Sequence, residues 1–140
     1  MFPFWKPVLA PVLAAAEVRR VVEIGALRGD NTREIIETLG PDAVLHVIDP
    51  VPGFDPSEHE REFPGRYAFH QALSLDVLGD LPPMDAALID GDHNWYTVFN
   101  ELQTLAATSR KAGRALPVLL LHDVGWPYGH RDLYYEPSQI

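Results

Sequence analysis

The sequence predicts one α/β domain, residues 1–140, in which a mainly parallel sheet of about five strands lies between two layers of helices. The length of 140 residues is typical of a single domain. Short apolar runs alternate with segments of helical periodicity, which is the pattern of strand–helix–strand units in a parallel sheet. The apolar runs contain few polar residues, as expected for strands that helices cover on both faces. These observations together indicate a three-layer α/β sandwich.

Five strands and three longer helices are expected along the chain. The helices are a leading helix at 2–18, a second at 31–39 with Asp30 or Asn31 as its cap, and a third in the C-terminal half. The apolar face of this third helix is expected to consist of Trp95, Val98, Phe99, Leu102 and Ala106. Residues 50–65 predict a long loop or a short irregular helix, and residues 75–78 predict one helical turn. The strands are expected at residues 20–24, 43–48, 66–70, 86–89 and 117–121.

Composition and charge exclude several classes of partner. The formal net charge is −9 and no basic stripe occurs, so nucleic acid and anionic membrane surfaces are not expected partners. The chain has no cysteine, which excludes disulfides and thiolate chemistry and is compatible with the cytoplasm, the expected location. Lys6 and the apolar run 7–16 loosely imitate a signal peptide. The single lysine and the two prolines in the run favour a helix packed on the sheet.

A glycine-containing turn follows the first expected strand. Gly25 would let the chain turn sharply off the strand, and Gly29 would let the next backbone approach a ligand. The helix after this turn would direct free N–H groups and partial positive charge toward that ligand. Asp49 ends the next strand, where a carboxylate can accept hydrogen bonds from ribose hydroxyls. The glycine spacing differs from the dinucleotide fingerprint, so a nucleoside without pyrophosphate is the expected ligand.

These residues resemble the class I S-adenosylmethionine (SAM)-dependent methyltransferases, which have a Rossmann-like fold. Glu23, Gly25 and Gly29 match the first motif of that family, and Asp49 matches its second. The phrase Asp90-Gly91-Asp92-His93 is similar to the fourth-strand motif of a subgroup that includes small-molecule O-methyltransferases. The resemblance covers about residues 18–125.

The resemblance implies a role for each matching position. Glu23, Gly25, Ala26 and Gly29 would line the methionine and ribose part of SAM, and Asp49 would hold the ribose. Asp90 would lie beside the methionine amino group or a metal ion. Ala72, Leu73 and Ser74 would flank the adenine, although Ser74 could equally cap a helix.

A second constellation ends the fourth and fifth expected strands. It consists of Asp90, Asp92, His93, His122 and Asp123. Because neighbouring parallel strands end at the same edge of a sheet, these side chains are expected to meet. His93 could act as a general base with Asp90 beside it, or Asp90 and Asp123 could bind a magnesium ion that activates the acceptor hydroxyl. His122-Asp123 departs from the Asp-Asp or Asp-Asn pair of the magnesium-dependent relatives. In the alternative in which these residues have only structural roles, Asp92 caps a helix and His122 is a hydrogen-bonded core residue.

The C-terminal residues depart from the family pattern. The family has a sixth and a seventh strand that form a hairpin, and residues 122–140 contain no such pattern. These residues carry Trp126, Tyr128, Tyr134 and Tyr135, which could form an acceptor lid, part of a homodimer interface, or a tail that packs on its own domain.

The sequence therefore predicts a SAM-dependent methyltransferase acting on an oxygen, or less favourably a nitrogen, of a small molecule. Magnesium is expected as a second cofactor only in the alternative in which Asp90 and Asp123 bind a metal ion. Two alternatives from other classes stay open: a SAM-binding module that has lost catalysis, and a metal-dependent hydrolase that uses the Asp/His cluster.

Overall fold

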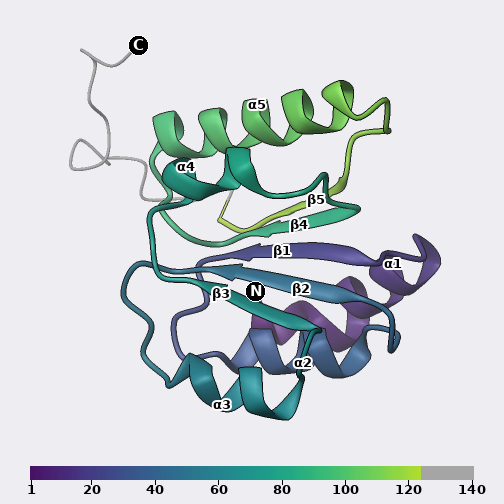
Figure 1. The fold of residues 1–140 in the computed structure, drawn as a ribbon, viewed down its shortest axis with the longest axis vertical. Coiled ribbons are helices and arrows are strands. Elements are labelled where there is room, and N and C mark those ends of the chain that lie inside the picture. The colour runs from purple at the N-terminus through teal and green to yellow at the C-terminus, as the bar shows by residue number, and fades with distance from the viewer. Residues whose placement is uncertain (124–140) are drawn as a thin grey trace.

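The computed structural model describes residues 1–123. They fold into a parallel sheet of five strands with helices on both faces (Figure 1). The strand order is β3-β2-β1-β4-β5 and every pairing is parallel. The strands are β1 (Arg20–Ile24), β2 (Val44–Ile48), β3 (Tyr67–His70), β4 (Ala86–Ile89) and β5 (Val118–Leu121). The predicted three-layer sandwich and each of its five strands are confirmed, with boundaries within one residue of those expected.

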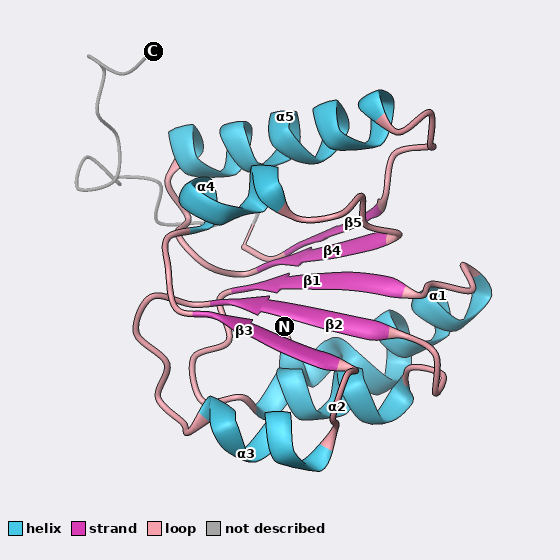
Figure 2. Ribbon diagram, in the orientation of Figure 1, coloured by secondary structure: helices cyan, strands magenta, loops and turns pink. Residues whose placement is uncertain are grey.

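The helices α1 (Ala10–Ala15), α2 (Asp30–Thr38) and α3 (Pro56–Glu62) cover one face of the sheet, and α4 (Ser74–Val77) and α5 (Trp95–Lys111) cover the other (Figure 2). A 3-10 turn η3 (Leu78–Asp80) continues α4. The two faces contain separate apolar clusters, one centred on Ile35 and Leu45 and the other on Ile24 and Leu105. No helix within residues 1–123 is long and apolar enough to cross a membrane.

The leading segment is not the single α-helix that the sequence predicts. It is a 3-10 turn η1 (Phe2–Phe4), a π-helical turn η2 (Trp5–Leu9) and then α1. Proline lacks an N–H group and its ring clashes with the preceding turn, so Pro7 and Pro11 interrupt regular α-helical bonding. Trp5 and Leu13 are nevertheless buried against the sheet, as a packed helix requires.

The inward face of α5 agrees only in part with the expected one: Val98 and Leu102 pack against the apolar cluster, as predicted. Glu101, Leu105 and Ser109 are buried, whereas Trp95 and Phe99 are exposed by 51% and 43%. The helix packs against α4 and η3 as well as the sheet, which rotates its buried face away from the face with the largest apolar side chains.

The order of the strands determines which edge of the sheet carries the candidate site. After β3 the chain returns to the other side of β1, so the direction of winding reverses between β1 and β4. Ligands of open α/β sheets bind at such a switch point, outside the carboxyl ends of the strands. Ile24 pairs with both Ile48 and Ile89, and Ile89 pairs with Leu121. The residues that follow these four are Gly25, Asp49, Asp90 and His122, which the register brings to one edge.

Candidate active site

The turn after β1 packs directly against the backbone after β4. Gly25 has a φ of +85°, and a Cβ atom built on it would lie 2.5 Å from the carbonyl oxygen of Asp90 and 2.6 Å from Cα of Gly91. No side chain fits there, because both contacts are with backbone. The glycine is therefore required by the contact between these two loops as well as by its own conformation.

The carboxylate of Asp49 holds the same turn from the other side. Its Oδ2 accepts hydrogen bonds from the backbone amides of Ala26 and Leu27, both at 2.9 Å, and its Oδ1 accepts one from Val51 at 2.9 Å. A carboxylate offers about four acceptor positions, so about one is left for a ligand. Asp49 is thus a structural clamp of the turn as well as a candidate ribose ligand.

Glu23 lies beneath this turn and is almost fully buried. Asn31 Nδ2 and Thr32 Oγ1 donate hydrogen bonds to its two carboxylate oxygens at 2.8 and 2.5 Å. Burial raises the pKa of Glu23 to about 7, against the lowering effect of the two hydrogen bonds. These bonds also explain why α2 lacks the predicted cap. Its N-cap is Gly29, without a side-chain bond, because Asn31 satisfies Glu23 and Asp30 makes no capping bond.

A cleft of about 380 Å³ opens above the turn, within the size range of small-molecule sites. Five of the predicted cofactor residues line it: Gly25, Asp49, Leu73, Ser74 and Asp90. Four do not: Glu23, Ala26, Gly29 and Ala72. Gly29 instead packs against the ring of Phe54, which would lie 3.1 Å from an added Cβ.

Sequence reasoning predicted Leu73 but missed Leu27 and Val51, which complete the apolar wall of this cleft. Leu27, Val51 and Leu73 line it and are exposed by 69%, 81% and 61%, although large aliphatic side chains are normally buried. Exposed apolar side chains that surround a concave site provide faces on which a flat, weakly polar ligand can pack. The available signal was the position of these residues in turns directly after strands.

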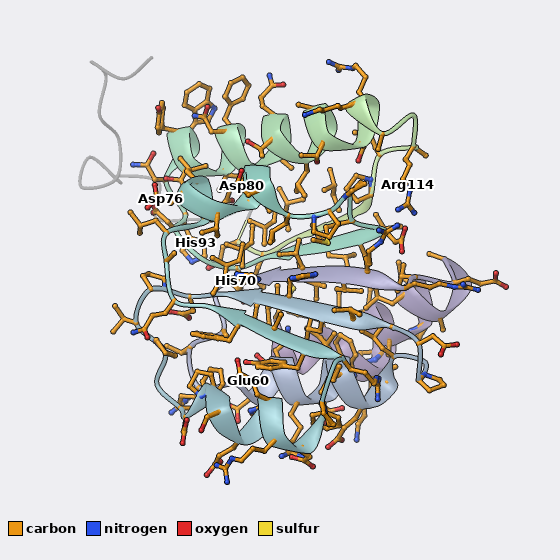
Figure 3. The ribbon with its side chains drawn as sticks, in the orientation of Figure 1. Glu60, His70, Asp76, Asp80, His93 and Arg114 are labelled. Atoms are coloured by element: carbon orange, nitrogen blue, oxygen red, sulfur yellow. The ribbon has the colours of Figure 1, made fainter. Side chains whose placement is uncertain are left out.

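A second cleft of about 350 Å³ adjoins the first and shares Gly91 and Asp92 with it. Trp95 and Phe99 form one wall, with their rings stacked at 5.1 Å between centroids and 11° between planes. Ile89 and Leu121 are also among its lining residues, and His93 lies at the same edge (Figure 3). The two aromatic side chains that the sequence placed in the core therefore line an open site.

The predicted Asp/His constellation is assembled at the junction of the two clefts. His122 Nδ1 lies 3.0 Å from Asp90 Oδ1 and 3.1 Å from Asp123 Oδ1, and His93 Nε2 lies 3.5 Å from Asp123 Oδ2. Asp90 Oδ2 accepts a hydrogen bond at 3.0 Å from the terminal ammonium group of Met1. His122 is therefore a member of the cluster, not a core residue.

Asp92 contributes to the start of α5, but not as its cap. Its two oxygens accept hydrogen bonds from the backbone amide of Asn94 at 3.0 Å and the hydroxyl of Thr97 at 2.8 Å. The N-cap is Asn94, whose side chain accepts from the amide of Tyr96 at 2.8 Å. Ser74 is not a cap either, because its hydroxyl donates to Glu101.

The cluster does not fit the magnesium that the resemblance allowed. Asp90, His93 and Asp123 can each offer one ligand atom, all within 4.8 Å of one another. Magnesium strongly prefers oxygen ligands, whereas this set includes an imidazole, and a second imidazole of His122 lies between the two carboxylates. The arrangement suits proton transfer better than magnesium binding.

Comparison with known proteins supports the same fold. No protein-family model matches the chain, and no curated protein sequence is significantly similar to it. Among solved structures it is similar to the O-methyltransferase TomG of Streptomyces achromogenes, which acts in tomaymycin synthesis and was solved in complex with SAM. The TM-score is 0.69 at 20% identity, over 98% of this chain and 62% of TomG. A protein of Klebsiella pneumoniae, provisionally assigned as an O-methyltransferase, matches with a TM-score of 0.54 at 25% identity, over 73% of this chain and 49% of its own.

The fold is therefore that of the class I SAM-dependent O-methyltransferases. The chain spans about three fifths of the length of TomG and about half that of the Klebsiella protein. The predicted aromatic residues Trp126, Tyr128, Tyr134 and Tyr135 lie outside the described residues.

Proposed function

We propose that this protein is a SAM-dependent methyltransferase that methylates an oxygen of a small molecule. The observation that carries the proposal is the pair of adjoining clefts at the switch point of the sheet, with an Asp/His cluster between them. A methyl transfer needs two binding sites that meet at one point, and catalysis consists largely of holding donor and acceptor in line. The likeness to the fold of TomG agrees with this proposal.

The first cleft suits SAM by its chemistry. Leu27, Val51 and Leu73 provide apolar walls for the adenine, and Asp49 has an acceptor position left for a ribose hydroxyl. Asp90, which lines the cleft, would hold the methionine amino group, because its carboxylate can accept charge-assisted hydrogen bonds from an ammonium group. When bound, SAM supplies a methyl group activated by the sulfonium charge.

The second cleft would bind the acceptor. Trp95 and Phe99 offer an aromatic surface on which a planar, largely apolar molecule can stack. The imidazole of His93 takes the proton that the acceptor hydroxyl loses as its oxygen attacks the methyl group. Asp123 stabilises the imidazolium so formed, since its Oδ2 lies 3.5 Å from Nε2.

Calorimetric titration with SAM tests the first cleft. Leu73→Glu places a charge against the proposed adenine wall, and because Leu73 is exposed the substitution does not disturb the core. We expect wild type to bind SAM and Leu73→Glu to bind it at least tenfold more weakly. Leu116→Glu is the matched control, because Leu116 is 62% exposed but lies outside both clefts. Absence of binding to wild type, or equal binding by both variants, would refute the cofactor assignment.

A transfer assay tests the chemistry. With methyl-labelled SAM and a panel of phenolic acceptors, His93→Gln should lower kcat about 10²- to 10⁴-fold, the usual contribution of a general base, with SAM affinity unchanged. Binding of SAM by wild type without transfer to any acceptor would instead favour the binding module that has lost catalysis.

A further inference from the structure

A buried hydrogen bond joins the wall of the first cleft to the long helix behind it. Ser74, which lines the cleft at the start of α4, donates its hydroxyl hydrogen to Oε1 of Glu101 on α5 at 2.5 Å. Both side chains are buried, with 8% of Ser74 and 1% of Glu101 exposed. A length of 2.5 Å is typical of a bond from a hydroxyl to an ionised carboxylate.

The other oxygen of Glu101 makes this arrangement unusual. Oε2 is buried and has no hydrogen-bond partner among residues 1–123. A fully buried carboxylate is costly unless it is paired, so the fold retains Glu101 at a cost in stability. The other buried residues on this face of α5 are the uncharged Leu105 and Ser109.

The bond fixes which side of the Ser74 hydroxyl faces a ligand. A serine hydroxyl has one donor hydrogen and two acceptor lone pairs, and its hydrogen normally rotates freely. Because Glu101 takes the hydrogen, only the lone pairs of Ser74 are left for the cleft. A ligand atom in contact with Ser74 must then be a hydrogen-bond donor.

We propose that Glu101 is a positioning residue that turns the lone pairs of Ser74 toward the cleft, so that the cleft selects a purine with a 6-amino group over its 6-oxo counterpart. This inference rests on the proposed binding of SAM, and it adds which residues would make that site prefer adenine. The 6-amino group of adenine donates hydrogen bonds, whereas the 6-oxo group of hypoxanthine accepts them and would face the lone pairs of Ser74.

The same bond makes the selection depend on pH. Burial raises the pKa of Glu101 to about 7, the Ser74 bond lowers it, and the charge of Asp92 in the loop before α5 raises it further. On the segment packed against α5, the other acids are Asp76 and Asp80, both exposed (Figure 3). Once protonated, Glu101 can donate to Ser74 Oγ, which frees the serine hydrogen to face the cleft and removes the selection against the 6-oxo group.

Calorimetric titration of wild type with S-adenosylhomocysteine and S-inosylhomocysteine at pH 8 and pH 6 tests the proposal. The two ligands differ at the 6-position and the adjacent ring nitrogen, so the ratio of their Kd values cancels most other effects of pH. We expect the adenosyl ligand to bind about 10- to 100-fold more tightly at pH 8, the usual consequence of leaving a buried polar group unpaired. At pH 6 this ratio should fall at least threefold.

Three variants separate the role of Glu101 from a merely structural one. Ser74→Ala should lower the ratio at pH 8 at least fivefold and abolish its pH dependence, and Glu101→Gln should make the ratio independent of pH. Ser109→Ala removes another buried serine on the same face of α5 and should leave the ratio and its pH dependence unchanged.

Two outcomes would overturn the inference in different ways. If wild type binds both ligands with a ratio that neither pH nor Ser74→Ala changes, Glu101 does not set the selection, although the site still binds the nucleoside. If wild type binds neither ligand at either pH, the proposed function itself fails, and this inference fails with it.

Discussion

Replacing Gly25 by alanine should lower the stability of the protein more than the same substitution at Gly40 or Gly65. Two costs add at this position. A residue with a Cβ is strained at a φ of +85°, at about 1–3 kcal/mol. The new methyl group would also lie 2.5 Å from the carbonyl oxygen of Asp90, and overpacking of this kind costs about 1–3 kcal/mol more. The expected loss is therefore about 2–6 kcal/mol of the free energy of unfolding.

Two other glycines separate these costs. Gly65 has a φ of +75° but open space around a new Cβ, so Gly65→Ala should carry the strain alone. Gly40 has neither a positive φ nor a neighbour within 4 Å, and Gly40→Ala should change stability by less than about 1 kcal/mol.

Urea unfolding of the three variants, followed by circular dichroism, measures these differences. The midpoints should fall in the order Gly40→Ala, Gly65→Ala, Gly25→Ala, with similar slopes. Equal losses for Gly25→Ala and Gly65→Ala would show that the β1 and β4 loops are not in contact, and the geometry of both clefts would then be wrong.

Three further predictions concern the buried carboxyl group of Glu23, the carboxylate of Asp49 that holds the turn after β1, and the ring of Trp95. The pKa of Glu23 is raised from 4.5 to about 7, so between these pH values the folded state keeps a proton that the unfolded state loses. The free energy of unfolding should therefore fall as pH rises through that window. Glu23→Gln should remove about 3 kcal/mol of this fall, measured by urea unfolding from pH 4.5 to pH 8. Asp49→Ala leaves three backbone amides without their acceptor and should cost about 2–4 kcal/mol even without ligand, so a weaker affinity for SAM in that variant counts only if its unfolding midpoint is measured too. Trp95→Ala should leave stability within about 0.5 kcal/mol and SAM affinity unchanged while raising the KM for a planar acceptor; a drop in thermal stability would instead mean that the ring packs in the core.

The β elements were predictable because parallel strands covered on both faces are predominantly apolar. The runs ending at Ile24, Ile48 and Ile89 are such strands, and each is bounded by a charged or glycine residue. The leading helix was less predictable, because the prolines at positions 7 and 11 produce π and 3-10 turns that periodicity does not distinguish from an α-helix.

The candidate site was only partly predictable, for a related reason. Gly25, Asp49 and Asp90 follow strands, and the register of a parallel sheet brings such residues to one edge. The roles of Glu23 and Trp95 could not be derived in the same way. Whether Glu23 faces a ligand or Asn31 depends on how α2 packs, and whether Trp95 faces the core depends on the rotation of α5.

The sequence by itself determined the layered fold and the edge of the sheet where the candidate site lies, and it predicted a nucleoside as the ligand. These follow from patterns that repeat along the chain, namely apolar strands, turns with glycine and acids at strand ends. Only the tertiary structure decided that Asp49 clamps the turn, that His122 lies between two carboxylates and that Ser74 and Glu101 are bonded. Apart from the adjacent pair His122 and Asp123, each of these contacts joins residues more than 20 positions apart in the chain. All of them depend on the directions of the side chains. The packing of helices on the sheet sets such contacts, and no local pattern in the chain encodes them.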